Sequence, residues 1–273
     1  MVAARLLGLG DNTVDTYVDA GVQFPGGNAV NVAVLARRLG LEAGYLGCLG
    51  TDEAGGLIAA ALAEEGVDLA RCRRVEGENA RARIVHNGGD RKFIGSIPGV
   101  RGRYDLGAED FAYIGGFDAV HTSVFSELDG ELPRIGARQV SYDFSERWND
   151  AVFDRVLPHI RIAFLSAPNR GDAEVEGVLR RCAASGVMAV ATRGAGGSMA
   201  LADGVVLRQG IVKADIVDTL GAGDGFIAGF LAARLRGAEV AAALARGAAF
   251  AATVCGWQGG FGHGSPWQDD STT

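Results

Sequence analysis

Cysteine and histidine are scarce in this chain of 273 residues, with four of each, and neither residue type forms a recognisable cluster. No C-x-x-C pair occurs, so we expect the widely spaced cysteines to be reduced core thiols rather than disulfides or zinc ligands. The histidines form neither an H-x-x-x-H nor an H-x-E pattern, which argues against a catalytic metal site. The cysteines are Cys48, Cys72, Cys182 and Cys255, and the histidines are His86, His121, His159 and His263.

The sequence also lacks a run of basic residues and a recognisable targeting segment. Lys and Arg number 26 against 33 Asp and Glu, which gives a net charge of −7. The absence of a basic stretch argues against a nucleic-acid-binding surface. The first apolar run, in MVAARLLGLGDNTVD, is too short to span a membrane and lacks the layout of a signal peptide. We therefore expect a cytoplasmic protein with neither a nucleic-acid nor a membrane partner.

Three common nucleotide-binding motifs are missing or incomplete. The chain has no G-x-x-x-x-G-K-[ST], so it is not a P-loop protein, and the protein-kinase motifs are absent as well. The stretch GLGDNT begins like a dinucleotide fingerprint, but Thr13 stands in the place of the third glycine. No helical pattern follows it, so a nicotinamide-binding site is disfavoured.

Apolar runs alternate with helix-like segments along most of the chain. ARLLGLG, AVHTSV, QVSYDFS, IAFLSAP and VMAVATRG read as buried strands, with helical patterns between them and two helices at about 222–236 and 238–255. Such alternation is typical of an α/β fold whose mostly parallel sheet is covered by helices on both faces. We expect one domain over residues 1–264.

Two regions interrupt this alternation. Residues 12–25 and 80–95 read as strands without intervening helices, and the turn signal NGGD in the second region predicts a hairpin. We expect a small antiparallel sheet that projects from the main domain. It could serve as a lid over a cleft or be a hairpin without function. We expect residues 265–273 to form a flexible tail.

Polar residues follow the first predicted strand and the glycines of FPGGNAVNVAV. Asp11 and Asp15 lie at the carboxyl end of that strand, where parallel sheets carry ligand contacts, although turn or capping roles explain them equally simply. Gly26 and Gly27 would let the backbone approach a ligand. We expect Asn28 to cap the following helix. The polar partner of Asn31 could be a ligand hydroxyl or the backbone.

The stretch IVDTLGAGDGFIAGFL places glycines and an acid at the start of a helix. The N–H groups around Gly221, Ala222 and Gly223 would form an anion site there. Their positive potential favours the charged form of Asp224, which we expect to be ionised at neutral pH. An ionised acid beside an anion site is suited to accept a proton from a hydroxyl that attacks a phosphate. A simple helix cap is the alternative.

Two further segments carry candidate residues. AVATRGAGGSMAL holds Thr192, Gly194 and Gly197 after a buried strand, a pattern that could hold phosphates or form a plain hairpin. In SAPNRGDAEV, Asn169 and Asp172 stand three residues apart between a strand and a helix. Asp172 could cap that helix or reach a magnesium–phosphate group through water, since Mg²⁺ keeps much of its water.

The pair of motifs GGNAVNVAV and DTLGAGDGFIAGF, about 190 residues apart, resembles the PfkB, or ribokinase-like, family of sugar kinases over residues 5–264. GDNTVDTY, YDFSERW and FLSAPN are most similar to the fructoselysine 6-kinases, which are bacterial fructosamine kinases. The resemblance implies a three-layer αβα sandwich with a β-sheet lid. It also implies ATP and Mg²⁺, K⁺ in many members, and lids that pair across a dimer in many relatives.

The resemblance assigns roles by position. Asp224 matches the family's catalytic base, and the residues before it match the anion hole. Asp218 lies near the equivalent of the K⁺ site, and Asp172 stands where the family's N-x-x-E motif has a glutamate, so its magnesium role rests on a shorter side chain. The sugar-binding positions correspond to Asp11, Asp15, Gly26, Gly27 and Asn31, and the nucleotide-binding positions to Asn169, Thr192, Gly194 and Gly197.

One position departs from the family pattern. The residue after the base is usually Ser, Thr, Ala or Cys, but here it is Gly225. Because glycine costs a helix about 0.5–1 kcal/mol relative to alanine, we expect a slightly looser first turn.

The sequence thus predicts transfer of the γ-phosphoryl group of ATP to a primary hydroxyl of a sugar-like substrate, with a fructosamine such as fructoselysine as the expected acceptor. The acids at Asp11 and Asp15 could meet the cationic amine of such a compound. A related kinase acting on a ribonucleoside, fructose or a 2-keto-3-deoxy acid is the nearer alternative. A non-catalytic regulator that binds a sugar or nucleotide is the more distant one.

Overall fold

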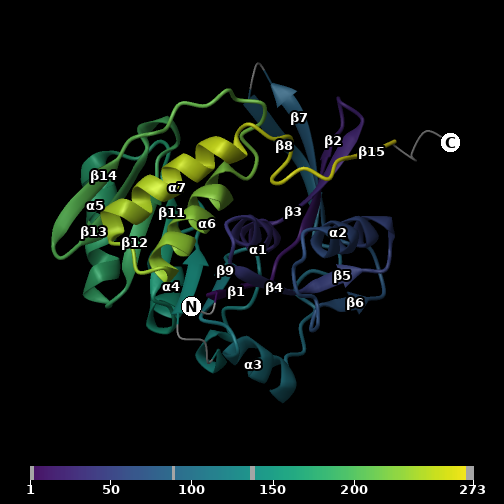
Figure 1. The fold of residues 1–273 in the computed structure, drawn as a ribbon, viewed down its shortest axis with the longest axis horizontal. Coiled ribbons are helices and arrows are strands. Elements are labelled where there is room, and N and C mark those ends of the chain that lie inside the picture. The colour runs from purple at the N-terminus through teal and green to yellow at the C-terminus, as the bar shows by residue number, and fades with distance from the viewer. Residues whose placement is uncertain (1–2, 88–89, 136–138, 269–273) are drawn as a thin grey trace.

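The computed structural model describes residues 3–87, 90–135 and 139–268, which contain a large β-sheet, a small β-sheet and a separate pair of short strands (Figure 1). The large sheet has eight strands in the order β14-β13-β12-β11-β10-β9-β1-β4. In this order, the six strands from β12 to β4 pair in parallel. Strand β13 pairs with β12 in an antiparallel way, and β14 pairs with β13 in the same way. The strands are β1 (Arg5–Leu9), β4 (Glu42–Leu46), β9 (Ala119–Ser123), β10 (Gln139–Asp143), β11 (Ile162–Ser166), β12 (Met188–Thr192), β13 (Ser198–Ala202) and β14 (Val205–Gln209).

Helices cover both faces of the large sheet, which confirms the three-layer sandwich. The larger apolar core joins one face to α1 (Asn28–Arg38), α2 (Glu53–Glu64), α6 (Ala222–Leu235) and α7 (Val240–Val254). Two smaller cores join the other face to α3 (Ala108–Gly115), α4 (Asp150–Val156) and α5 (Asp172–Ala184). In the part of the chain that the structure describes, no helix has the length and apolar character needed to cross a bilayer.

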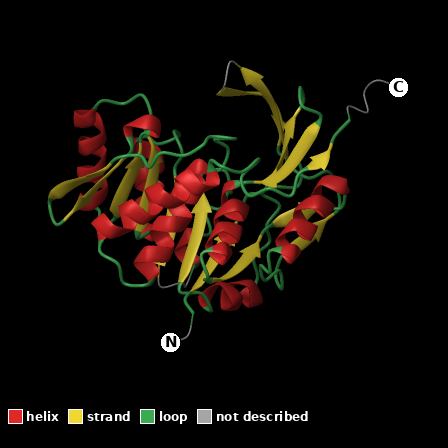
Figure 2. Ribbon diagram, turned by 45° about the horizontal axis from the view of Figure 1, so that its top comes forward, coloured by secondary structure: helices red, strands yellow, loops and turns green. Residues whose placement is uncertain are grey.

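The small sheet stands beside the α/β body (Figure 2) and contains the two regions that interrupt the alternation. Its order is β15-β3-β2-β7-β8, and the turn between β7 and β8 falls on residues 88–89, outside the described residues. The prediction that this sheet is antiparallel is wrong at one place, because β2 and β7 pair in parallel. The long segment between β3 and β7 supplies the crossover that parallel pairing requires. The strands are β2 (Thr13–Tyr17), β3 (Val22–Gly26), β7 (Arg81–Asn87), β8 (Asp90–Ile97) and β15 (Ser265–Pro266), while β5 (Cys48–Gly50) and β6 (Arg73–Val75) form a separate pair.

The start of the expected flexible tail is ordered. Ser265 and Pro266 form β15 and pair with Gln23 and Val22 of β3. The backbone N–H of Trp267 then donates to the carbonyl of Gly21 at 2.8 Å. The segment is held because β3 has an open edge whose backbone groups need partners. The rest of the expected tail, residues 269–273, lies outside the described residues.

Helix α1 is capped by an acid that precedes it in the chain and not by its own first residue. Asn28 is its first helical residue and Gly27 its N-cap, so the expected cap by Asn28 is wrong. The carboxylate of Asp11 instead accepts the N–H of Asn28 at 2.7 Å. This frees the amide of Asn28 for the site described below. Helix α2 is capped by Asp52, whose side chain accepts the N–H of Gly55 at 3.1 Å.

Close packing between α6 and α7 explains why the residue after Asp224, Gly225, is a glycine. A Cβ at Gly225 would lie 2.7 Å from a methyl carbon of Val254. A Cβ at Gly229, one turn later, would lie 2.9 Å from the carbonyl oxygen of Arg246. Real Cβ atoms are not found this close to other carbons or oxygens. Glycine at these positions therefore lets the two helices approach each other, and the backbone around Asp224 is held against α7.

Candidate active site

A cleft of about 810 Å³ lies between the small sheet and the carboxyl ends of the central strands. Residues from the predicted acceptor, nucleotide and catalytic positions line it together. Those that do so are Asp11, Asp15, Gly27, Asn31, Thr192, Gly221, Gly223 and Asp224. The fold thus brings segments from both ends of the chain to one place, as expected for residues at the carboxyl edge of a parallel sheet.

Two amides of α1 hold the carboxylate of Asp224. Asn28 Nδ2 donates to Asp224 Oδ1 at 2.7 Å. Asn31 Nδ2 donates to Asp224 Oδ2 at 2.6 Å. Asn31 therefore has a side-chain partner that was not among the two considered from sequence. Amide donors stabilise the charged form of a carboxyl group, so this arrangement suits an ionised proton acceptor.

The first turn of α6 supplies the expected amides. Gly221 is the N-cap in the left-handed conformation, with φ 77°. The first bond within the helix runs from Gly225 N to Gly221 O at 2.7 Å, so the N–H groups before Gly225 lie outside the helical ladder. Ala222 N donates to the carbonyl of Thr219 at 3.2 Å. Gly223 is exposed and has open space where a side chain would stand.

Asp11 is buried, and hydrogen bonds from other parts of the chain hold its carboxylate. In addition to the N–H of Asn28, it accepts the hydroxyl of Ser123 at 2.7 Å and that of Ser126 at 2.9 Å. The capping role considered from sequence is therefore real, and it fixes the direction in which this carboxylate faces the cleft. Asp15 is also buried, and a side chain at Gly26 would collide with its Oδ2.

The predicted nucleotide residues are only partly brought together. Thr192 lines the cleft, whereas Asn169 is exposed in the turn before α5. Asp172 is the first residue of α5 and not its cap, and it forms ion pairs with Arg193 at 2.7 Å and Arg208 at 2.8 Å. Arg193 belongs to the loop that also holds Gly194 and Gly197. A Cβ at Gly197 would lie 2.1 Å from the carbonyl oxygen of Gln209, so close backbone packing explains that glycine.

Asp218 lies outside the residues that line the cleft and ties three segments together. Its carboxylate accepts the hydroxyl of Tyr17 at 2.6 Å, the N–H of Leu220 at 2.9 Å and the N–H of Gly259 at 3.0 Å. Among the described residues, no group of three or more His, Cys, Asp or Glu side chains could hold a metal ion by itself.

Sequence reasoning missed an acid beside Asp224. Asp143 ends β10, and its Oδ2 accepts Asn28 Nδ2 at 3.0 Å. Burial is the largest cause that raises the pKa of Asp143 to about 7; the N–H of Ser145 opposes this shift, and the charges of Asp224 and Asp11 add to it. An acid at the carboxyl end of a strand was the signal that singled out Asp11, and the same signal would have found Asp143. Sequence reasoning also missed the arginines that line the cleft, namely Arg81, Arg101 and Arg147.

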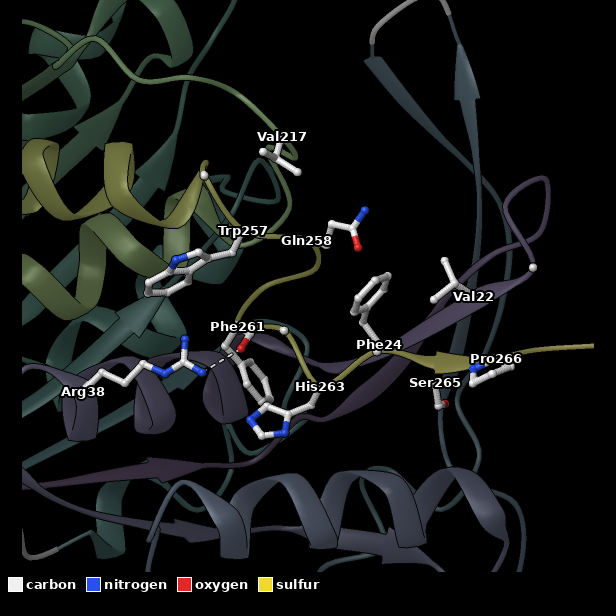
Figure 3. A pocket seen from close by; sticks show the side chains of 14 residues that line it. Val22, Phe24, Arg38, Val217, Trp257, Gln258, Phe261, His263, Ser265 and Pro266 are labelled. Carbon is white, nitrogen blue, oxygen red and sulfur yellow. Dashed lines mark hydrogen bonds between the residues drawn. The ribbon is translucent and has the colours of Figure 1, made fainter.

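A second cavity of about 700 Å³ lies apart from these residues (Figure 3). Aromatic side chains of β3 and of the segment after α7 surround it, namely Phe24, Trp257 and Phe261. Arg38 lies at its edge and donates to the carbonyl of Phe261 at 2.8 Å. None of the residues predicted for catalysis or binding lines this cavity, so the cleft at Asp224 remains the candidate active site.

Comparison with known proteins agrees with the motifs and the fold. The model of the pfkB family of carbohydrate kinases matches residues 3–263. The chain belongs to this family. It is therefore a carbohydrate kinase that uses ATP, as the resemblance implied.

Individual relatives are similar over nearly their whole length. The chain is 41% identical to fructosamine kinase FrlD of Bacillus subtilis, over 97% of this chain and 95% of the relative. It is 33% identical to fructoselysine 6-kinase of Shigella flexneri, over 92% of this chain and 97% of the relative. Other members of the pfkB family, such as a fructokinase of Klebsiella pneumoniae at 29% identity over 82% of each chain, also match.

Among solved structures, Arabidopsis thaliana ribokinase complexed with ribose and ATP superposes with a TM-score of 0.84 at 22% identity, covering 98% of this chain and 96% of that one. This likeness confirms the ribokinase-like fold.

Proposed function

We propose that this pfkB-family kinase phosphorylates a primary hydroxyl of a fructosamine, with fructoselysine as the first acceptor to test. The observation that carries the proposal is the Asp224 carboxylate, which two amides hold at 2.6 and 2.7 Å in a cleft shared with Asp11 and Asp15. The similarity to relatives named fructosamine kinase and fructoselysine 6-kinase supports this choice of acceptor.

In the proposed reaction, Asp224 accepts the proton of the acceptor hydroxyl as its oxygen attacks the γ-phosphorus. A new phosphorus–oxygen bond forms, and the bond to the bridging oxygen of ADP breaks. The amides at the start of α6, near Gly221 and Gly223, face the negative charge of the transferring group. Closure of the small sheet over the cleft would exclude water, which would otherwise compete as acceptor.

The acceptor side of the cleft contains both acids and bases. Asp11 and Asp15 suit hydroxyl groups and the cationic amine of a fructosamine. Asn31 Oδ1 is buried and has no hydrogen-bond partner among the described residues, so an acceptor hydroxyl would satisfy it. Arg101 lines the same cleft. Its charge suits the carboxylate of the amino-acid part of fructoselysine, but it also suits a 2-keto-3-deoxy sugar acid, which keeps that alternative open.

On the nucleotide side, we propose that Thr192 and the loop carrying Gly194 and Gly197 contact ATP, with Asn169 beside its phosphates. Mg²⁺ binds through phosphates, water and one or two carboxylates, so the donor set of this cleft fits it without a protein cage. When bound, it would offset phosphate charge. Asp172 could act on it only indirectly, because two arginines already pair with this acid. A K⁺ ion near Asp218 belongs to the same proposal.

The small sheet also suggests an assembly. Its edge strand β8 exposes three large apolar side chains, Phe93, Ile94 and Ile97. We propose that two copies of the chain pair through this edge to form a homodimer. A cytoplasmic location belongs to the proposal as well, since ATP is available there and the four free cysteines stay reduced.

The test of the base assignment is Asp224→Asn, which preserves the shape of the side chain. Because general-base catalysis contributes about 10²–10⁴-fold, turnover should fall by at least about 100-fold with ATP binding and fold retained. Asp215→Asn is the matched control, since it removes the same charge from an exposed loop outside the cleft. Near-normal turnover by Asp224→Asn would end the base assignment.

The acceptor is tested with a panel that contains fructoselysine, fructose, a ribonucleoside and a 2-keto-3-deoxy sugar acid. The proposal expects the highest kcat/KM with fructoselysine, measured as acceptor-dependent formation of ADP. If another compound gives a higher kcat/KM, that compound replaces fructoselysine as the proposed acceptor. If no compound leads to formation of ADP, the non-catalytic regulator is favoured.

A further inference from the structure

The amide of Asn28 touches more of the site than its place in the glycine motif indicates. One Nδ2 atom lies 2.7 Å from Asp224 Oδ1 and 3.0 Å from Asp143 Oδ2. An amide NH₂ group carries two hydrogens, so it can donate one to each carboxyl group. Asn28 therefore bridges the proposed base and the buried acid beside it.

This bridge exists in only one orientation of the amide. If the side chain were flipped, Oδ1 of Asn28 would face the carboxylate of Asp224, and two oxygen atoms would meet without a hydrogen between them. A hydrogen-bond donor next to Oδ1 of Asn28 would favour the orientation in which Nδ2 faces Asp224. His121 of β9 occupies that position, with its Nε2 2.9 Å from Asn28 Oδ1.

The contacts of His121 fix which ring nitrogen carries the proton. Asn28 Oδ1 can only accept, so His121 Nε2 must donate. His121 is fully buried, and burial lowers the pKa of its ring to about 3, so the ring is neutral. The other ring nitrogen, Nδ1, is then an acceptor, and it lies 2.9 Å from the hydroxyl oxygen of Ser141. Ser141 on β10 donates its single hydrogen to it in preference to the carbonyl of Val120, which lies farther from the hydroxyl oxygen, at 3.2 Å.

We infer that Asn28 is a positioning residue for Asp224, and that His121, as its Nε2–H tautomer held by Ser141, fixes the direction in which the Asn28 amide faces. The hydrogen bonds run in one direction from the central sheet to the cleft. The inference rests on the proposed role of Asp224 as the base. The two strands that carry His121 and Ser141 pair directly in the sheet, so they form a rigid support.

Removing this support should change the chemistry at Asp224 rather than the binding of ATP. Asn28 turned the wrong way would leave Asp224 Oδ1 without its donor, and loss of a donor disfavours the charged carboxylate. The other titratable or charged groups that face this point are Asp143 of β10 and Asp11 after β1, with Asp15 of β2 and the arginines Arg81, Arg101 and Arg147 on the same cleft. The two that bond to Asn28 itself, Asp143 and Asp11, are acids, so the loss should move the acid limb of the kcat profile to higher pH.

The test compares His121→Phe with His121→Gln in the full-length protein, with ATP and fructoselysine as substrates. Phenylalanine keeps a ring of similar size beside Phe164 but offers no donor, whereas glutamine can present an N–H to Asn28. We expect His121→Phe to lower kcat about 10- to 100-fold, with KM for ATP within about twofold of the original value, and His121→Gln to recover most of the loss. Thr122→Val is the matched control, since its buried hydroxyl on the same strand has no partner among the described residues.

Two results would overturn the inference. One is a kcat and a pH profile of His121→Phe equal to those of the unsubstituted enzyme. The other is a proton on Nδ1 of His121 in ¹⁵N NMR spectra of the unsubstituted enzyme, because Nε2 could then not donate to Asn28. We expect these spectra to show a neutral His121 with its proton on Nε2 between pH 5 and pH 8. This measurement also decides the matter if His121→Phe does not fold. Full activity of Asp224→Asn would instead refute the base assignment, so the two failures are distinguishable.

Discussion

Substituting Gly225 by alanine tests whether the packing of α6 on α7 holds the catalytic end of α6. The new Cβ would lie 2.7 Å from one methyl carbon of Val254 and 3.2 Å from its Cβ. Val254 is fully buried and β-branched, so it cannot rotate away without cost. Such overpacking costs about 1–3 kcal/mol. The intrinsic helix preference of alanine returns about 0.5–1 kcal/mol.

The free energy of unfolding should therefore fall by about 1 kcal/mol, which corresponds to a drop of about 2–4 °C in the melting temperature of a domain of this size. Thermal and urea denaturation measure it. Gly177→Ala is the matched control, because a Cβ at that helical position meets nothing within 4 Å and should stabilise α5. Val254→Ala removes the clash, so the double variant with Gly225→Ala should lose less stability than the two single variants together.

The reasoning is refuted if Gly225→Ala is as stabilising as Gly177→Ala, since α6 and α7 would then separate freely. It is also refuted if the stability losses in the double variant simply add. Turnover gives a further check, because a shift of the first turn of α6 moves Asp224. We expect kcat to fall in Gly225→Ala and to recover partly in the double variant.

The remaining predictions concern pH, capping and the small sheet. The pKa of Asp143 is about 7 in the folded protein and near 3.8 when unperturbed, so the native state binds the proton more tightly than the unfolded state does. The free energy of unfolding should therefore fall as pH rises from about 4 to 7. Asp143→Asn should flatten this slope in thermal denaturation. Asp52→Ala should lower the free energy of unfolding by about 1–2 kcal/mol in urea titrations, since it removes the cap of α2, and Asp52→Asn, which keeps a capping oxygen, should restore most of it. Saturation with fructoselysine and an ATP analogue should slow amide exchange in β7 and β8, and unchanged exchange with a true acceptor would argue against a lid.

Much of this architecture could be predicted because it depends on local pattern. Buried strands alternate with helices, and the glycine–acid stretch at Asp224 lies at a helix start, so periodicity and end signals were sufficient. The pairing of β15 with β3 could not be predicted, because Ser265 and Pro266 form no apolar pattern and follow an edge that exists only in the folded sheet. A two-residue strand carries no periodic signal.

The same distinction applies within the site. Asp224 was found from its own neighbours, but its partners come from α1, nearly 200 residues earlier. The glycine motif indicated a cap for Asn28, whereas the fold gives that role to Asp11 and turns the Asn28 amide toward two carboxyl groups. Likewise, helix propensity indicated only that Gly225 makes the helix less stable. The fold shows why a glycine stands there, because a larger residue would collide with Val254. Contacts between distant segments decide such roles, and sequence pattern does not contain them.

The assembly of the site from α1 and α6 has a consequence for the chain during its synthesis. Asn28 and Asn31 leave the ribosome long before Asp224, which needs α6 to be folded against α1 before its carboxylate is oriented. An unfinished chain therefore contains the amides but neither the proposed base nor the helix start proposed to receive phosphate. With this assignment, the ability to transfer phosphate arises only when the last two helices have packed.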